Sequence, residues 1–302
     1  MTAELDAILT YRSELAFRAA LNDRIREVAA DLGLAHNDMA RRFALQQFIS
    51  RIFSADPHSW VITGGTALQF RTSEARPTAD VDLAVTRQIF DISEQLRTAS
   101  ARRGGEHGQF QVDVRGVPTN PGFYTGRITY MLNGTRFAVA KIDIAAHREL
   151  PVQPDSITPE PVLRIDDTWP MPPVSTMSVP THLADKLAAM HERHNDMPSS
   201  RAHDLADMLI ISRSCTVEAS ELRRAIEVQK QQRDIAIPEV LQLPSPDWRS
   251  TYRNRVSQSG LPAGLRDADA ALAEVNAFLG PVLGGRVTAG HWDPVRRRWE
   301  VT

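Results

Sequence analysis

Asp80 and Asp82 are the residues whose types and spacing most clearly suit a chemical task. Side chains along a β-strand alternate between two faces, so both carboxylates would point the same way while Val81 points into a core. On the same argument the hydroxyl of Thr78 lies at the rim of this pair. Two neighbouring carboxylates repel unless they share a cation. Their hard oxygen ligands suit Mg²⁺ or Mn²⁺, whose other positions take water and substrate phosphate.

A glycine turn precedes this pair in the chain. Gly64, Gly65 and Thr66 follow a short apolar run at 60–62 and precede a stretch that can begin a helix. Glycines at a strand-to-helix turn let backbone N–H groups approach a phosphate closely, and the helix N-terminus adds favourable partial charge. The Thr66 hydroxyl supplies one more donor. We therefore expect these residues to bind nucleotide phosphates, and Thr78 to contact the same nucleotide.

A third carboxylate, Asp143, lies in the segment 137–145, which reads as an apolar strand. An unpaired charge is costly in such surroundings, so Asp143 needs a partner. We expect Asp143 to complete the metal site with Asp80 and Asp82 and to be a candidate proton acceptor.

Lys186 lies on an apolar helix face with Leu183, Leu187 and Met190, at three- and four-residue steps that bring them together. A lysine in that position needs an anionic partner. One candidate is a nucleotide triphosphate, which we favour, and the other is an ion pair with Asp204 or Asp207. These aspartates are three residues apart on one helical face, where they would orient Lys186 or contact the nucleotide.

The elements that position these residues follow from periodicity and turn signals. Residues 11–53 have apolar residues at three- and four-residue steps and predict a helical lead-in. Asn133-Gly134 tolerates the positive φ angles of a tight turn and predicts a hairpin. A proline-rich passage at 159–173 predicts a surface connector. Further strands are expected at 60–62, 81–85, 110–117, 126–132 and 135–145, with a helix at 91–102 that stops at Gly104-Gly105.

From residue 180 onward the pattern is helical nearly to the end of the chain. The last segment, 291–299, predicts a small turn or hairpin anchored by aromatic residues. The fold class is therefore α+β, with a nucleotide-binding core and helical lead-in at 1–175 and a mainly α-helical C-terminal domain at 176–302. The helices are expected at 180–194, 201–215, 217–233, 247–257 and 265–279.

Composition excludes several classes of protein. The formal net charge of -2 disfavours a protein that coats nucleic acid by bulk electrostatics. The single cysteine, Cys215, excludes an internal disulfide. The first residues carry acidic and basic side chains throughout and lack the apolar run of a signal peptide, so we expect a cytoplasmic protein with no membrane span.

Four short motifs together resemble one known family, the AbiEii/MenT-type nucleotidyltransferases. These are toxins of type IV toxin–antitoxin systems, within the DNA polymerase β-like superfamily. The motifs stand in the family's order over roughly residues 60–210, and the C-terminal third adds none. They are Gly64-Gly65-Thr66-Ala67-Leu68, Arg76-x-Thr78-x-Asp80-x-Asp82, Lys186 in its helix, and Arg201-x-His203-Asp204-x-x-Asp207.

This resemblance implies a polymerase β-like core with a mixed sheet, bound Mg²⁺ and a nucleoside triphosphate substrate. It implies transfer of a nucleoside monophosphate to an acceptor, with release of pyrophosphate. For the MenT-like branch the implied acceptor is the 3′ end of tRNA, which would block translation, and the implied partner is an antitoxin protein. The sequence departs from many relatives at His203-Asp204, where they have Lys-Asp.

Two alternatives remain open at this stage, and a third is disfavoured. The acceptor can be a small molecule, as in antibiotic-modifying nucleotidyltransferases. The chain can be a non-catalytic module that binds a nucleotide or a partner through a degenerate site. Finally, His194, His203-Asp204 and Asp207 resemble the metal-binding His-Asp phosphohydrolases, but that fold is wholly helical and leaves Asp80, Asp82 and the glycine turn unexplained.

Overall fold

The chain divides into two compact units in the computed structural model. The division passes near residue 175, and two short earlier segments cluster with the second unit. The domain boundary expected from the sequence stays a prediction. The first unit consists of 1–62, 78–148 and 156–175, and the second of 63–77, 149–155 and 176–302. The structure describes residues 9–75, 78, 80–101, 106–146, 148–195, 197–257 and 259–301.

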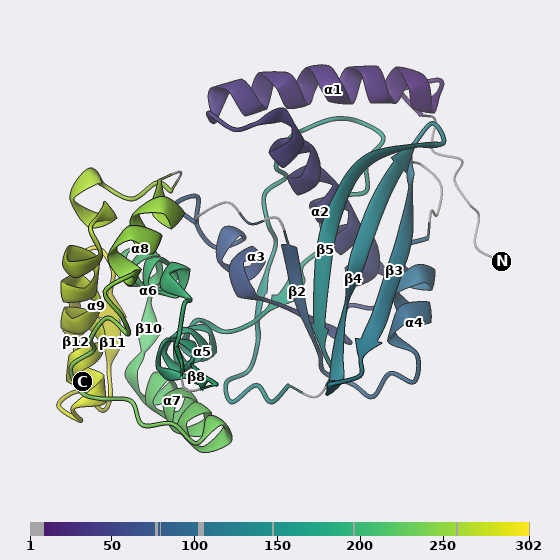
Figure 1. Cartoon of the computed structure of the whole chain (residues 1–302). Helices are drawn as coiled ribbons and strands as arrows, with labels where there is room; N and C mark the ends of the chain where they lie inside the picture. The colour runs from purple at the N-terminus through teal and green to yellow at the C-terminus, as the bar shows by residue number, and fades with distance from the viewer. Residues whose placement is uncertain are drawn as a thin grey trace. The chain divides into compact units, whose positions relative to one another are not determined.

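A seven-stranded sheet with the order β3-β4-β5-β2-β1-β7-β6 organises the first unit (Figure 1). Strands β2 and β5 run parallel, while β4 is antiparallel to both β3 and β5, so the sheet is mixed as expected. The strands are β1 (Trp60–Thr63), β2 (Asp80–Val85), β3 (Gln109–Val117), β4 (Asn120–Leu132), β5 (Thr135–Ala145), β6 (Asp155–Ile157) and β7 (Val174–Thr176).

The hairpin between β4 and β5 turns where the sequence predicted it. Asn133 and Gly134 have φ angles of 51° and 68°, a conformation that asparagine and glycine adopt at little cost. Strand β4 begins at Asn120, six residues before the expected start, and pairs with β3 over most of its length. The glycine stop expected at Gly104-Gly105 lies outside the described residues.

Helices pack on the sheet of the first unit. Two of them, α1 and α2, cover most of residues 11–53 and confirm the helical lead-in that the sequence predicted there. Gly33, with a φ of 63°, separates the first two helices, because glycine adopts this left-handed conformation without a steric penalty. Helix α2 packs on β5 and α4 on β3 (Figure 1). Phe17, Phe43 and Tyr130 are buried in the resulting core. These helices are α1 (Glu14–Asp31), α2 (His36–Ala55) and α4 (Ile92–Ala99).

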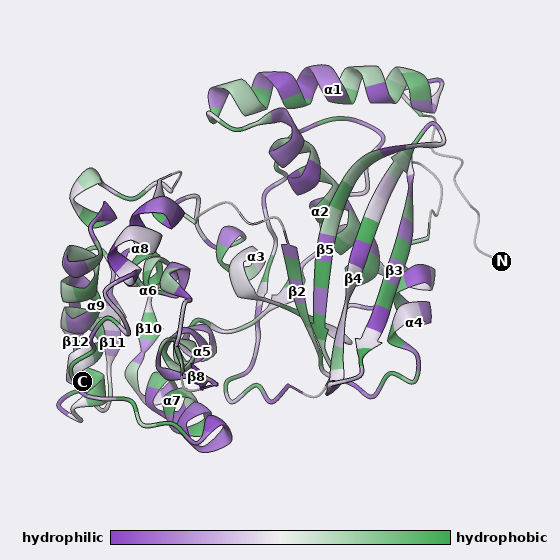
Figure 2. Ribbon diagram, viewed as in Figure 1, coloured by the Kyte–Doolittle hydropathy of each residue, from purple (hydrophilic) through white to green (hydrophobic). Residues whose placement is uncertain are grey.

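The second unit is mainly helical and has its own core. Figure 2 shows hydrophobic residues recurring along its helices, as a buried face requires. A small hairpin places Trp292 and Trp299 against Phe278, with ring centroids 4.6 and 5.7 Å away, which confirms the aromatic anchor. Its elements are α3 (Gly64–Gln69), α5 (Val179–His191), β8 (Arg193–His194), β9 (Met197–Pro198), α6 (Ala202–Ser214), β10 (Val217–Glu218), α7 (Ala219–Arg233), α8 (Trp248–Val256), η1 (Ala263–Arg266), α9 (Ala268–Leu283), β11 (His291–Asp293) and β12 (Arg298–Glu300).

The helix expected at 180–194 is wrong at its C-terminal end. Helix α5 ends at His191, and β8 then pairs with β9. Asn195 has a φ of 51°, which reverses the chain between these short strands and cannot continue a helix. His191 and His194 therefore do not share a helix face. In the described part of the chain, no helix is long and apolar enough to cross a membrane.

Candidate functional site

Strand β2 places Asp80 and Asp82 on one face of the sheet. Both side chains are partly exposed, whereas Val81 and Leu83 between and beyond them are buried, at 0% and 1% exposure. This is the alternation that period-two geometry produces when one face of a strand packs on a core. The two carboxylates therefore lie on the same, more accessible side of the strand.

Strand β5 brings Asp143 beside Asp82. The two residues are Cα partners in the parallel pairing, and Thr125 of β4 is the partner of Asp143 on its other side. The Thr125 hydroxyl donates to Oδ1 of Asp143 over 2.6 Å, and Nζ of Lys141 donates to Oδ2 over 2.6 Å. Both oxygens of Asp143 thus accept a hydrogen bond from within the sheet.

Lys141 is a member of this group that the sequence reasoning missed. It is the Cα partner of Asp80 and lies two residues from Asp143 on the same strand face. Its hydrogen bond to Asp143 raises the pKa of Lys141, and the charges of Asp143, Asp80 and Asp82 raise it further. The spacing Lys-x-Asp within the expected strand 135–145 could have revealed from the sequence that Lys141 shares a strand face with Asp143. We call Asp80, Asp82, Lys141 and Asp143 the strand cluster.

The chemistry of the strand cluster fits a divalent cation, because it offers three carboxylates and already attracts one positive charge. Its geometry is not that of a preformed cage: among the described residues, no three His, Cys, Asp or Glu side chains are arranged to hold one ion. Asp143 is instead directed to Thr125 and Lys141. Metal binding by Asp80, Asp82 and Asp143 stays a prediction.

Thr78 lies just before β2 and is partly buried. Its hydroxyl is 3.5 Å from the backbone carbonyl oxygen of Asp80, the long end of the hydrogen-bonding range. This contact ties Thr78 to the start of the strand. Arg76, from the same motif, lies outside the described residues, and nucleotide contact by Thr78 stays a prediction.

The glycine turn belongs to the second unit by its contacts. Helix α3 begins at Gly64 directly after β1, as expected, and is six residues long. Gly64 has a φ of 59°, so this position requires the conformational freedom of glycine. Gly65 and Thr66 are buried at the first turn of the helix. Phosphate binding by these three residues stays a prediction.

Lys186 lies in the core of the second unit between two carboxylates. Its Nζ donates to Oδ1 of Asp204 and to Oδ2 of Asp207, each over 2.7 Å, and both aspartate side chains are 0% exposed. Nε of Arg201 donates to the other oxygen of Asp204 over 2.6 Å. We call Lys186, Arg201, Asp204 and Asp207 the helix cluster. The structure thus shows the ion pair that was one of the two possibilities for Lys186.

Burial shapes the electrostatics of the helix cluster. Burial alone would lower the pKa of Lys186, but the charges of Asp204 and Asp207 outweigh it and raise that pKa. Burial likewise opposes ionisation of Asp204, yet Lys186 and Arg201 hold its pKa well below the usual range. His182, buried beside them, has its pKa lowered to about 3 by burial and by the charge of Lys186. His182 is therefore neutral near pH 7.

His203 approaches the same carboxylate, with Nε2 3.4 Å from Oδ1 of Asp204. The His203-Asp204 pair, where the sequence departs from many relatives, thus lies at the edge of the helix cluster. Asp204 is shared among Lys186, Arg201 and His203.

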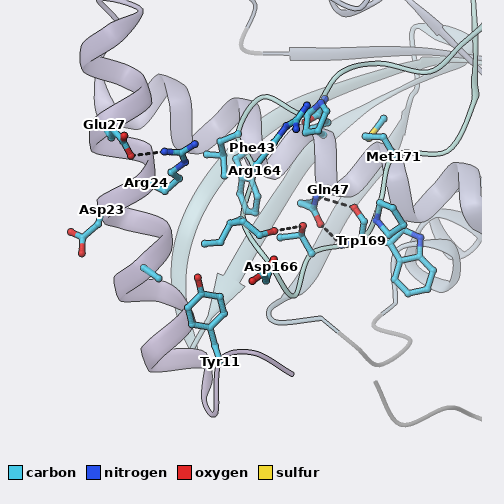
Figure 3. Close-up of a pocket in the computed structure, with 17 residues that line it drawn as sticks. Tyr11, Asp23, Arg24, Glu27, Phe43, Gln47, Arg164, Asp166, Trp169 and Met171 are labelled. Atoms are coloured by element: carbon cyan, nitrogen blue, oxygen red, sulfur yellow. Dashed lines mark hydrogen bonds and ion pairs between the residues drawn. The ribbon is translucent and has the colours of Figure 1, made fainter. Parts of the chain in front are cut away.

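A cavity of about 680 Å³ in the first unit contains none of these residues (Figure 3). It lies between α1, α2 and the connector at 161–171. Some of its lining polar groups are engaged with each other: Arg24 pairs with Glu27, and Gln47 bonds both the N–H and the carbonyl of Trp169 (Figure 3). The cavity is therefore separate from the residues that the sequence predicts for catalysis and nucleotide binding.

Comparison with known families assigns the chain. The profile of the family described as "Nucleotidyl transferase AbiEii toxin, Type IV TA system" matches residues 47–274, which is most of the sequence. The chain belongs to the AbiEii family. This membership confirms the resemblance drawn from the four motifs and implies an enzyme that transfers nucleotides. The seven-stranded sheet and the family together exclude the wholly helical His-Asp phosphohydrolases.

A solved toxin structure shares the fold of this AbiEii-family chain. The nucleotidyltransferase toxin MenT4 from Mycobacterium tuberculosis aligns with a TM-score of 0.57 at 15% identity, over 84% of this chain and 89% of that one. JHP933 from Helicobacter pylori aligns with a TM-score of 0.46 at 14% identity, over 80% and 92%. A second H. pylori structure gives a TM-score of 0.47 at 14% identity, over 81% of this chain and 96% of that one. No curated protein sequence matches the chain.

Proposed function

We propose that this AbiEii-family chain transfers a nucleoside monophosphate from a nucleoside triphosphate to an RNA acceptor, the 3′ end of tRNA, and so blocks translation. The observation that carries the catalytic part is the register of β2 with β5, which aligns Asp82 with Asp143 and leaves Asp80 on the same strand face. The family supplies the reaction class. The MenT-like resemblance of the motifs supports the tRNA acceptor.

In the proposed reaction, an acceptor hydroxyl attacks the α-phosphorus of the nucleotide in line with the departing pyrophosphate. The new bond joins the acceptor oxygen to phosphorus, the bond from phosphorus to the bridging oxygen breaks, and the hydroxyl loses its proton. Asp80, Asp82 and Asp143 would hold Mg²⁺ or Mn²⁺, which polarises the phosphate and stabilises the charge of the leaving group. Asp143 is our candidate to accept the proton.

We assign nucleotide binding to the residues that the sequence predicted for it. Gly64, Gly65 and Thr66 would contact phosphates through a turn whose first glycine has a positive φ. Lys186 keeps its proposed phosphate contact, but its ion pairs also support a role in holding Asp204 and Asp207. Thr78 would contact the nucleotide from the edge of β2.

An antitoxin protein is the proposed partner, because the family is described as the toxin of a type IV toxin–antitoxin system. Cytoplasmic location is part of the same proposal, since nucleoside triphosphates and tRNA are found there.

The test is to incubate the full chain with each labelled nucleoside triphosphate, with and without total tRNA, in Mg²⁺ or in a chelator. We expect one of the labelled nucleoside triphosphates to label the 3′ end of tRNA. This labelling should occur in Mg²⁺ and not in the chelator. Label in an aminoglycoside-like acceptor but never in tRNA would instead establish the small-molecule alternative. Tight nucleotide binding without transfer to any acceptor would establish a non-catalytic module.

A further inference from the structure

We propose that Lys141 competes with the divalent cation: its ammonium occupies Oδ2 of Asp143 in the metal-free protein and must leave that oxygen before a metal can bind there. This inference rests on the proposed metal site. None of the four motifs quoted for the family includes Lys141.

The hydrogen bonds of Asp143 carry the argument. Thr125 occupies Oδ1 and Lys141 occupies Oδ2, each at 2.6 Å. Mg²⁺ binds carboxylate oxygens at about 2.1 Å, so a metal on Oδ2 would lie within a few ångströms of the Lys141 ammonium. Two cations that close repel strongly near a protein surface. Metal and lysine therefore exclude each other at this oxygen.

The neighbours of Lys141 explain why its ammonium turns to the carboxylates. In the register of the sheet, Asp80 lies on one side of Lys141 and Arg127 on the other. Like charges directly opposite each other on neighbouring strands are destabilising, whereas opposite charges attract. Arg127 is exposed, so both lysine and arginine extend from the same sheet face. Lys141 is thus drawn toward Asp143 and away from Arg127.

Exchange is possible because Lys141 is not locked in place. Its side chain is 52% exposed and that of Asp143 is 18% exposed. A long, half-exposed side chain can return its ammonium to water without opening a core. Thr125 acts in the opposite sense: its hydroxyl orients Asp143 and carries no charge that would repel a metal. It is a positioning residue for the metal ligand.

The experiment measures Mn²⁺ affinity of the full chain without nucleotide, by electron paramagnetic resonance of the free ion. Lys141→Gln should bind Mn²⁺ about three- to tenfold more tightly than wild type, because one half-exposed ion pair and one like charge are removed. Lys141→Arg should stay near wild type. Thr125→Val should bind more weakly, since Asp143 loses its orienting bond. Lys230→Gln, which loses only the pair with Glu227, is the matched control and should not change.

A second measurement follows the lysine itself. Lys141, Lys186 and Lys230 are the lysines of the chain, so amine labelling read by mass spectrometry distinguishes them. Adding Mn²⁺ should increase labelling of Lys141 and leave the labelling of the partly exposed Lys230 and the buried Lys186 unchanged. Equal or weaker Mn²⁺ affinity of Lys141→Gln would overturn the inference while leaving the metal site intact. If wild type and all variants bind no Mn²⁺, the metal site of the proposed function fails as well.

Discussion

The strand cluster and the helix cluster both place aspartates around a lysine, but their side chains differ in solvent exposure. Lys141 is 52% exposed, whereas Lys186 is 6% exposed between carboxylates that are 0% exposed. A cation at the surface can be exchanged for another at small cost. Removing a buried one leaves uncompensated charges in the core. The comparison indicates that the open cluster can exchange its cation readily, whereas loss of the cation from the closed one would destabilise the unit that contains it.

The largest expected effect is on stability, in the helix cluster. Lys186→Met should lower the free energy of unfolding by about 3–5 kcal/mol, because Asp204 and Asp207 would lose the cation between them in the core. Urea denaturation followed by circular dichroism measures this. Lys230→Met is the control, since its surface pair with Glu227 is worth at most about 1 kcal/mol. Similar losses of unfolding free energy in Lys186→Met and Lys230→Met would show that the buried lysine of the helix cluster stabilises the fold no more than a surface lysine does.

The next effect is on catalysis, in the strand cluster. Asp82→Asn should reduce nucleotide transfer by roughly 10²–10³-fold, about 2.7–4 kcal/mol in the barrier, because one electrostatic catalytic group is lost. Its partly exposed position predicts little change in unfolding. The control is Asp113→Asn on β3, whose side chain is 70% exposed and pairs with Arg115. Wild-type turnover in Asp82→Asn would refute the assignment of the strand cluster to the active site.

A smaller effect links metal to folding. Mn²⁺ at about 100 times its dissociation constant should stabilise the wild-type fold by about 2.7 kcal/mol, because the ion binds the native state and not the unfolded chain. Thermal unfolding with and without Mn²⁺ measures the shift. Asp82→Asn should show much less stabilisation and Lys230→Met as much as wild type. A shift that survives in Asp82→Asn would place the ion outside the strand cluster.

The smallest effect is a pH dependence from His182, beside the helix cluster. Its pKa is about 3 in the native chain against 6.5 ordinarily, so between these values the unfolded chain binds a proton that the native chain does not. The stability contribution is therefore complete above about pH 6.5 and is lost as the pH falls toward 3. The free energy of unfolding should decrease by roughly 1.4 kcal/mol per pH unit from this group.

Urea denaturation at several pH values between 6.5 and 4.5 measures the slope. His182→Gln should reduce the slope of unfolding free energy against pH by roughly 1.4 kcal/mol per pH unit, which is the contribution of one proton. The same substitution at the exposed His58 should leave the slope unchanged. This window lies above the ordinary range of the aspartates, so the low pKa of Asp204 contributes mainly at lower pH. An unchanged slope in His182→Gln would show that the histidine does not stay neutral in the core.

Much of the architecture was accessible from the sequence. The helical lead-in, the strand-to-helix turn at Gly64, the hairpin at Asn133-Gly134 and the tryptophan hairpin at the end were all predicted and are confirmed. These features depend on local preferences, namely hydrophobic period and tolerance of positive φ. The end of α5 was missed because the turn at Asn195 interrupts a pattern that continues to look helical.

The sequence alone determined that Asp80 and Asp82 share a strand face, because the alternation of side chains is a local property of extended backbone. It also determined that Lys186 needs an anion. Only the tertiary structure decided that Asp143 lies beside Asp82 and that Lys141 lies beside Asp80, since both follow from the pairing of β2 with β5 across some sixty residues of chain. It likewise decided which anions surround Lys186, because helix packing brings α6 against α5. Register and packing are set by the burial of whole faces, so no single motif encodes them.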